Sequence, residues 1–170
     1  MTKPGKIALV WANHPKALPT AVPNSFALGV TQQGWDLTIA HPKGYDLPAE
    51  VMERCRRNAL KAGARFKVTE DRDQALSGAR VVYAKSWGRL DMYGRDDEEI
   101  GHRKAMNLAR WIVDRTAMAR TDKAKFMHCL PVRRNVVVTD EVLDSAASIV
   151  VDQAENRLHV QKAVLAWLLG

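Results

Sequence analysis

Lys6-Ile7-Ala8-Leu9-Val10-Trp11 is the stretch that decides the fold. It is a short apolar run close to the beginning of the chain, and such a run is typical of a strand that is buried on both faces of a sheet. Prolines follow it at positions 15, 19 and 23. We therefore expect an inner strand at residues 6–11 and a stiff connection after it.

Strand-like and helix-like segments alternate along the rest of the chain. Further strands are expected at residues 36–40, 65–69, 80–84, 126–130 and 148–151. Helices are expected at residues 24–33, 48–63, 73–76, 96–111, 139–144 and 154–169, and the second of them is opened by Pro48 and ended by Gly63. This alternation predicts an α/β fold, a doubly wound, mainly parallel sheet with helices on both faces, in one Rossmann-like domain of residues 1–170.

The composition is that of a soluble globular protein, with 46% hydrophobic and 26% charged residues. No apolar run is long enough to span a membrane, and residues 1–6 lack the apolar stretch of a signal peptide. A cytoplasmic location is therefore expected. Cys55 and Cys129 are interpreted as free thiols rather than as a disulfide.

The net charge of +7 and the pI near 9.6 fit either a nucleic acid or a small anionic substrate as partner. The positive charges are dispersed along the chain, and no aromatic residues alternate with them. We therefore expect no nucleic-acid partner, and either an ordinary basic surface or a site for a small anion.

The last helix carries two apolar stripes, where a surface helix normally carries one. One stripe is formed by Val160, Val164, Trp167 and Leu168, and the other by Leu158, Leu165 and Leu169. We expect this helix to pack on its own sheet and also on a partner. The alternative is a well-buried terminal helix.

Polar residues gather where the expected strands end, and ligands of open parallel sheets bind beyond the carboxyl ends of the strands. These positions are Asn13 to Lys16, Lys85 to Gly88, Cys129 to Arg134, and Asp152 to Arg157. We expect them to line one cleft. No cofactor and no metal are expected, because the sequence has no glycine-rich phosphate loop, no zinc-ligand spacing and no nucleophile elbow.

Residues 128–135, His-Cys-Leu-Pro-Val-Arg-Arg-Asn, resemble the amino-acid-binding loop of the carbamoyltransferases. Residues 11–16, 83–87 and 154–162 extend the resemblance to the second half of ornithine-type enzymes, and most closely to the N-acetylornithine and N-succinylornithine branch. These enzymes transfer the carbamoyl group of carbamoyl phosphate to an amine, in arginine biosynthesis. The resemblance implies the same activity for an intact protein that contains this domain.

Lys85 is the departure with the clearest physical meaning. Ornithine carbamoyltransferases have an aspartate at this position, which suits the free α-ammonium group of ornithine. Acylation removes that charge and leaves a carboxylate, for which a lysine is suited. The resemblance therefore favours an N-acylated ornithine, although Lys85 could instead be a solvent-exposed loop lysine. A lysine that some acetylornithine enzymes carry is replaced here by Val137, so the choice between acetyl and succinyl stays open.

The resemblance also implies roles for individual residues. Electrostatic stabilisation and positioning should dominate carbamoyl transfer over covalent catalysis. Catalytic roles fall on Cys129 and Arg157, and substrate-binding roles on His14, Lys85, Leu130 and Arg133. The alternative for Cys129 is a small buried residue at a strand end. His128 is expected to be structural, and Arg134 is either a ligand contact or a surface charge.

The carbamoyl-phosphate half of the family, with its Ser-x-Arg-Thr-Arg type loop, has no counterpart in these residues. The chain is therefore interpreted as an isolated domain with negligible turnover alone, whose implied partners are that half, carbamoyl phosphate and an N-acylated ornithine. The resemblance further implies a homo-oligomer, a trimer in the intact family, and a knot through the proline loop. The alternative to the knot is an unthreaded loop.

Alternatives of other classes are a knotted RNA methyltransferase and a non-catalytic binding module. The first is of similar length and charge, but the glycine-rich loops that hold its cofactor are missing here. The second would bind an acylated amino acid without any partner that restores activity. Within the family, ornithine and N-succinylornithine remain alternative substrates.

Overall fold

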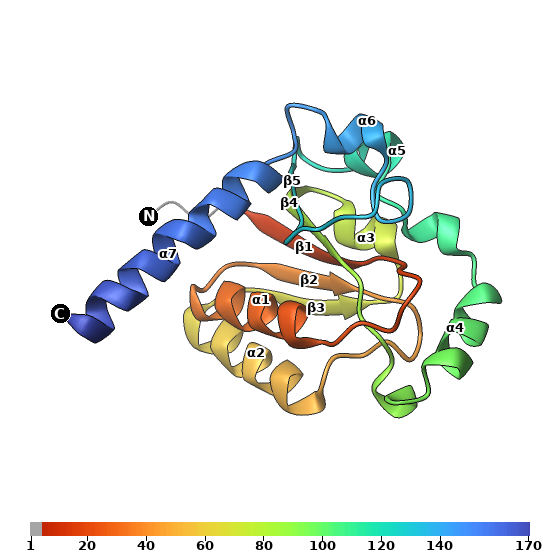
Figure 1. Ribbon diagram of the computed structural model, residues 1–170, viewed down its shortest axis with the longest axis horizontal. Coiled ribbons are helices and arrows are strands. Elements are labelled where there is room, and N and C mark those ends of the chain that lie inside the picture. Colours follow the sequence, from red (N-terminus) through yellow and green to blue (C-terminus); the bar gives the residue numbers. More distant parts are fainter. Residues whose placement is uncertain (1–4) are drawn as a thin grey trace.

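Five parallel strands form the central sheet (Figure 1). The computed structural model describes residues 5–170, so residues 1–4 of the predicted domain lie outside the described range. The strands are β1 (Lys6–Trp11), β2 (Leu37–Ala40), β3 (Phe66–Thr69), β4 (Ala79–Lys85) and β5 (Lys125–Met127), in the order β3-β2-β1-β4-β5. Every pairing between neighbours is parallel. The predicted α/β class and doubly wound sheet are confirmed.

The inner strand β1 is buried because its apolar side chains face the core on both sides of the sheet. Residues 8–11 have no exposed surface, and β1 pairs with β2 on one edge and with β4 on the other. Fully burying one large apolar side chain stabilises the fold by about 1.5–3 kcal/mol. The core of the domain is therefore built around the stretch that the sequence singled out.

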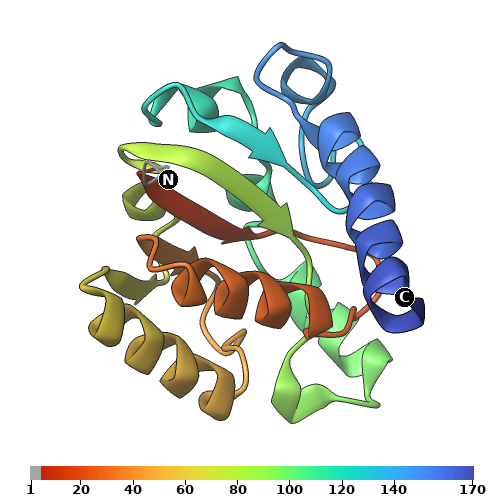
Figure 2. The same cartoon turned by 90° about the vertical axis from the view of Figure 1, so that its left-hand side faces the viewer.

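Two layers of helices cover the sheet. Helices α1 (Ala21–Gln32) and α2 (Ala49–Ala62) pack against each other and over β2 and β3, while α3 (Arg72–Leu76) contacts β1 to β4 (Figures 1 and 2). Right-handed crossovers place α3 on the opposite face from α1 and α2. Pro48 is the N-cap of α2 and Gly63 its left-handed C-cap, close to where the sequence placed both.

The predicted helix at residues 96–111 is shorter than expected. Helix α4 (Asp96–Lys104) ends at Lys104, and η2 (Leu108–Trp111) is a separate 3-10 turn. The chain turns because Trp111 is buried and packs edge-on against Trp11, with 5.8 Å between ring centroids. Tertiary packing thus overrides a locally helical sequence. The sequence also gave no indication of η1 (Leu90–Met92) or α5 (Arg115–Ala119).

The predicted sixth strand, residues 148–151, is wrong. Ser148 makes one isolated bridge to Phe126, and α7 (Val150–Leu169) begins two residues later, with Gln153 already bonded to the Ile149 carbonyl. The fifth strand is also shorter than the predicted 126–130, because Leu130 has a φ of 47° and leaves the extended conformation. The short helix expected at 139–144 is confirmed as α6 (Asp140–Leu143).

Helix α7 leaves the domain after its first turn (Figure 1). Val150 is buried and the Gln153 amide donates to the Tyr83 hydroxyl at 3.3 Å, but residues 154–169 are exposed throughout. The expected packing of this helix on its own sheet is thus limited to its first turn, and the alternative of a well-buried terminal helix is wrong. Both apolar stripes face solvent. None of the helices in residues 5–170 is long and apolar enough to span a bilayer.

Gly63→Ala and Gly29→Ala should change stability in opposite directions. An added Cβ meets no atom within 4 Å at either site, but Gly63 has a φ of 62°, whereas Gly29 lies inside α1. We expect Gly63→Ala to lower the free energy of unfolding by about 1–2 kcal/mol. Gly29→Ala should raise it by about 0.5–1 kcal/mol. Urea unfolding of the two variants measures both, and changes of the same sign would contradict this account of α2.

Candidate functional site

The carboxyl ends of β1 and β4 lie side by side where the strand order reverses. Trp11 is in register with Lys85, and the Ala12 amide donates to the Lys85 carbonyl at 3.0 Å. Strand β5 pairs with the other edge of β4. The segments that follow these strands therefore meet at one edge of the sheet, as the sequence predicted.

His14 and Arg133 connect the segments after β1 and β5. Arg133 Nε donates to His14 Nε2 at 3.0 Å, across 119 positions of sequence. His14 Nδ1 lies 3.1 Å from the Lys16 carbonyl and 3.0 Å from the Lys16 amide. Because Arg133 can only donate, Nε2 is the acceptor, and a neutral ring carries its proton on Nδ1, towards the Lys16 carbonyl. Burial, and then the charges of Arg133, Lys85 and Arg103, lower the pKa of His14, against the opposing bond to Lys16. The site thus favours the neutral imidazole.

Lys85 is a buried cation at this edge. Only 8% of the residue is exposed, and no carboxylate forms an ion pair with it within residues 5–170. Burial lowers its pKa, while the nearby Cys129 acts in the opposite direction. A buried ammonium group without a counter-ion favours the binding of an anion. The alternative of a solvent-exposed loop lysine is therefore wrong.

Cys129 is a neighbour of both Lys85 and Tyr83. Burial, and then the neighbouring Cys129, raise the pKa of Tyr83, whose hydroxyl also accepts the bond from Gln153. Cys129 is a partly exposed free thiol and Cys55 a buried one, so the prediction of unpaired cysteines is confirmed.

His128 lies next to the candidate site, although the sequence predicted only a structural role for it. It is 4% exposed, and its Nδ1 accepts a 3.0 Å bond from the Leu130 amide, which fits the structural role we expected. Burial, and then the charges of Lys85 and His14, lower its pKa to about 4. His128 therefore also lies beside the predicted binding residues. The alternation of a strand could not show this, since β5 ends at Met127.

Arg134 and Arg157 differ in their contacts. Arg134 donates to Asp140 and Asp144 at 2.7 Å, which raises its pKa and ties it to α6, so it is occupied within the chain. Arg157 is exposed on α7, one turn beyond Gln153, and makes no hydrogen bond or ion pair within the described residues. The structure thus brings together His14, Lys85, Cys129, Leu130 and Arg133, whereas no hydrogen bond or ion pair within residues 5–170 joins Arg157 to them.

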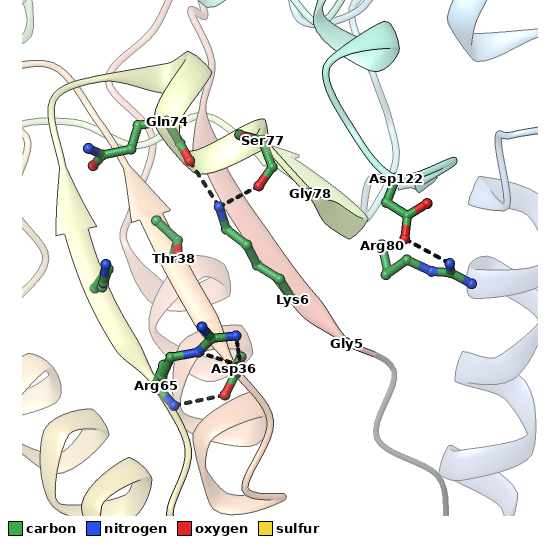
Figure 3. A pocket seen from close by; sticks show the side chains of 11 residues that line it. Gly5, Lys6, Asp36, Thr38, Arg65, Gln74, Ser77, Gly78, Arg80 and Asp122 are labelled. Atoms are coloured by element: carbon green, nitrogen blue, oxygen red, sulfur yellow. Dashed lines mark hydrogen bonds and ion pairs between the residues drawn. The ribbon is translucent and has the colours of Figure 1, made fainter.

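A cavity of about 460 Å³ lies at the opposite edge, among the amino ends of the strands (Figure 3). Lys6 Nζ donates there to the Gln74 and Ser77 carbonyls at 2.9 and 2.8 Å. Arg65 pairs with Asp36, and Arg80 pairs with Asp122. These groups stabilise the end of α3 and the strand connections, so this cavity is not the candidate site.

Comparison with known proteins gives a consistent result. The family described as aspartate/ornithine carbamoyltransferase, Asp/Orn binding domain, matches residues 6–168. An N-acetylornithine carbamoyltransferase of Xanthomonas campestris is 45% identical over 97% of this chain and 48% of its own length. An N-succinylornithine carbamoyltransferase of Bacteroides thetaiotaomicron is 40% identical over 89% of this chain and 42% of its own length.

Among solved structures, an acetylornithine transcarbamylase complexed with acetylcitrulline superposes with a TM-score of 0.93 at 44% identity. The match covers 99% of this chain and 50% of that one. The chain therefore spans about half the length of the relatives it matches.

The burial of His128 should make stability depend on pH. Its pKa is lowered from 6.5 to about 4 in the folded protein. Between these two pH values His128 is protonated in the unfolded chain but stays neutral in the folded one. The free energy of unfolding should fall as the pH drops from about 6.5 towards 4, by at most roughly 3 kcal/mol from this residue. In His128→Gln, which keeps an acceptor for the Leu130 amide but does not titrate, this part of the slope should disappear. Urea unfolding at several pH values measures the difference, and equal slopes would contradict the assignment.

Proposed function

The chain belongs to the aspartate/ornithine carbamoyltransferase family, and from that premise we propose that it is the amino-acid-binding half of an N-acetylornithine carbamoyltransferase. In the whole protein, a carbamoyl-phosphate half would hold the donor, and this domain would present the side-chain amine of the acylated ornithine. Four relatives that are 43–45% identical to this chain carry the name N-acetylornithine carbamoyltransferase, which supports this assignment.

The observation that carries the proposal is the buried charge of Lys85 beside His14 and Arg133. An N-acylated ornithine offers a carboxylate and no α-ammonium group, so it supplies the counter-ion that Lys85 lacks. Free ornithine would bring an additional cation close to Lys85 and Arg133, and like charges at short range are unfavourable. The neutral ring of His14 and the Arg133 guanidinium complete the proposed binding residues, with Leu130.

Carbamoyl transfer requires a neutral amine to attack the carbonyl carbon while phosphate leaves. We assign Cys129 and Arg157 to the reacting centre as polar contacts, with Cys129 close to Lys85 and Arg157 reaching from α7 towards the phosphate. These groups would stabilise developing charge and align the reactants, and no covalent intermediate on Cys129 is needed. The side-chain amine would lose its proton to phosphate or to solvent.

Helix α7 supplies the proposed surface for the carbamoyl-phosphate half. Large apolar side chains are exposed along its length, at Leu158, Val160, Val164, Leu165, Trp167, Leu168 and Leu169. Contiguous exposed apolar surface of this kind marks a protein interface. A homo-oligomer of the intact protein, a cytoplasmic location and a knot in the proline loop stay predictions. The succinyl group stays the alternative to acetyl, since N-succinylornithine enzymes are also similar.

Ligand binding by the domain tests the proposal. An NMR titration should give saturable shifts around residues 14 and 85 with N-acetylornithine, and weaker or no shifts with free ornithine. Lys85→Met should lower the affinity about 10- to 100-fold, the loss of one charge-assisted interaction. Lys43→Met, which removes an exposed lysine from the loop after β2, is the control and should bind normally. A preference for free ornithine would refute the role of Lys85.

Reconstitution tests the role of α7. The 170-residue polypeptide alone should form no measurable acetylcitrulline from carbamoyl phosphate and N-acetylornithine, and a separately produced carbamoyl-phosphate half should restore turnover. Leu165→Asp on α7 should abolish that restoration without unfolding the domain, because the residue is 55% exposed. Leu60→Asp on α2, 83% exposed, is the matched control and should be restored normally. Robust turnover by the polypeptide alone would overturn this assignment.

A further inference from the structure

A buried ion pair on α4 lies at the centre of the loops that carry the site. Glu99 is 1% exposed and Arg103 is 2% exposed, and they are one helical turn apart. Arg103 Nε donates to Glu99 Oε1 at 2.9 Å, and its Nη2 donates to the same oxygen. An arginine buried in this way must satisfy its remaining donors inside the protein.

The remaining donors of Arg103 reach the loops after β1, β2 and β4. Nη1 donates to the His14 carbonyl at 2.8 Å and lies 3.4 Å from the Lys16 carbonyl. Nη2 donates to the Trp87 carbonyl at 3.2 Å, and Nε also approaches the Tyr45 hydroxyl at 3.3 Å. One guanidinium therefore connects the backbone of a predicted ligand residue, His14, with the segment two residues beyond Lys85.

The surroundings hold this guanidinium in place. It lies 5.5 Å from the ring centroids of both Trp11 and Tyr45. Trp11 Nε1 donates to the same Trp87 carbonyl at 2.9 Å, and Trp87 Nε1 donates to the Tyr45 carbonyl at 2.7 Å. On the other side of the ion pair, a Cβ at Gly88 would come within 2.8 Å of Glu99 Oε2, so only glycine admits the carboxylate at this distance.

We infer that Arg103, held by Glu99, is a positioning residue for the amino-acid site. It fixes the His14 backbone so that the imidazole meets Arg133, and it fixes Trp87 so that Lys85 keeps its buried place at the end of β4. This inference rests on the proposed function for the identity of the ligand. A lysine cannot substitute for Arg103, because a single ammonium group lacks the fork that reaches both backbone segments at once.

The test compares Arg103→Lys with a variant of similar expected destabilisation far from the site, Leu37→Ala. Leu37 is 1% exposed at the amino end of β2, and loss of such a side chain weakens the core without touching the carboxyl edge. The readout is the NMR titration of the His14 ring, together with the Arg133 Nε–H signal. Arg103→Lys keeps the charge but not the fork, so the pKa of His14 should rise and the Arg133 signal should lose its protection from exchange.

In Leu37→Ala, both signals should match the unmodified chain. Unchanged signals in Arg103→Lys would overturn the inference, and equal changes in both variants would reduce Arg103 to a merely structural role. A second arm measures the affinity for N-acetylornithine, which should fall at least tenfold in Arg103→Lys and stay unchanged in Leu37→Ala. If the unmodified chain binds no acylated ornithine, the proposed function fails on that arm, while the His14 titration still decides the inference.

Discussion

The central position of β1, with β2 on one side and β4 on the other, is the constraint on which the rest of the structure depends. A strand enclosed in this way must be apolar on both faces, so residues 7–10 of β1 offer no polar side chain. Chemistry is therefore confined to the ends of the strands. The chain first adds β2 and β3 on one side of β1 and then β4 and β5 on the other. The segments after Trp11 and Lys85 therefore start next to each other at the carboxyl edge and run in opposite directions, and the residues that follow them line the space between.

Much of the fold follows from local sequence, and its errors have identifiable physical causes. Apolar runs and breaker residues located β1 to β4 and the first helices to within a few residues. The predicted strand at residues 148–151 is wrong because β-branched side chains favour a strand only where a neighbouring strand continues the hydrogen bonding. Phe126 forms a single bridge there, to Ser148. The predicted helix at residues 96–111 is too long because the chain turns to bury Trp111. Local helix propensity does not reveal such a tertiary contact.

The site was less accessible to sequence reasoning than the fold. The positions of His14, Lys85 and Arg133 at strand ends followed from the sequence together with the resemblance to a family, and their binding roles stay predictions. The pair Glu99–Arg103 could not be found in this way. On a polar helix, a glutamate followed by an arginine four positions later is typical of a solvent-exposed pair of small energetic value. Burial reverses that interpretation, since the removal of one partner leaves an uncompensated charge.

Helix α7 contributes only its first turn to the domain, where Val150 is part of the core. After Gln153 its side chains touch solvent, so substitutions there leave the packing of the sheet unchanged. The packing of this domain consequently does not constrain the last 17 residues, from Ala154 to Gly170. The exposed apolar side chains of α7 therefore do not contribute to the core of this domain. Under the proposed arrangement, these side chains would contribute to association with the carbamoyl-phosphate half and not to the stability of this domain.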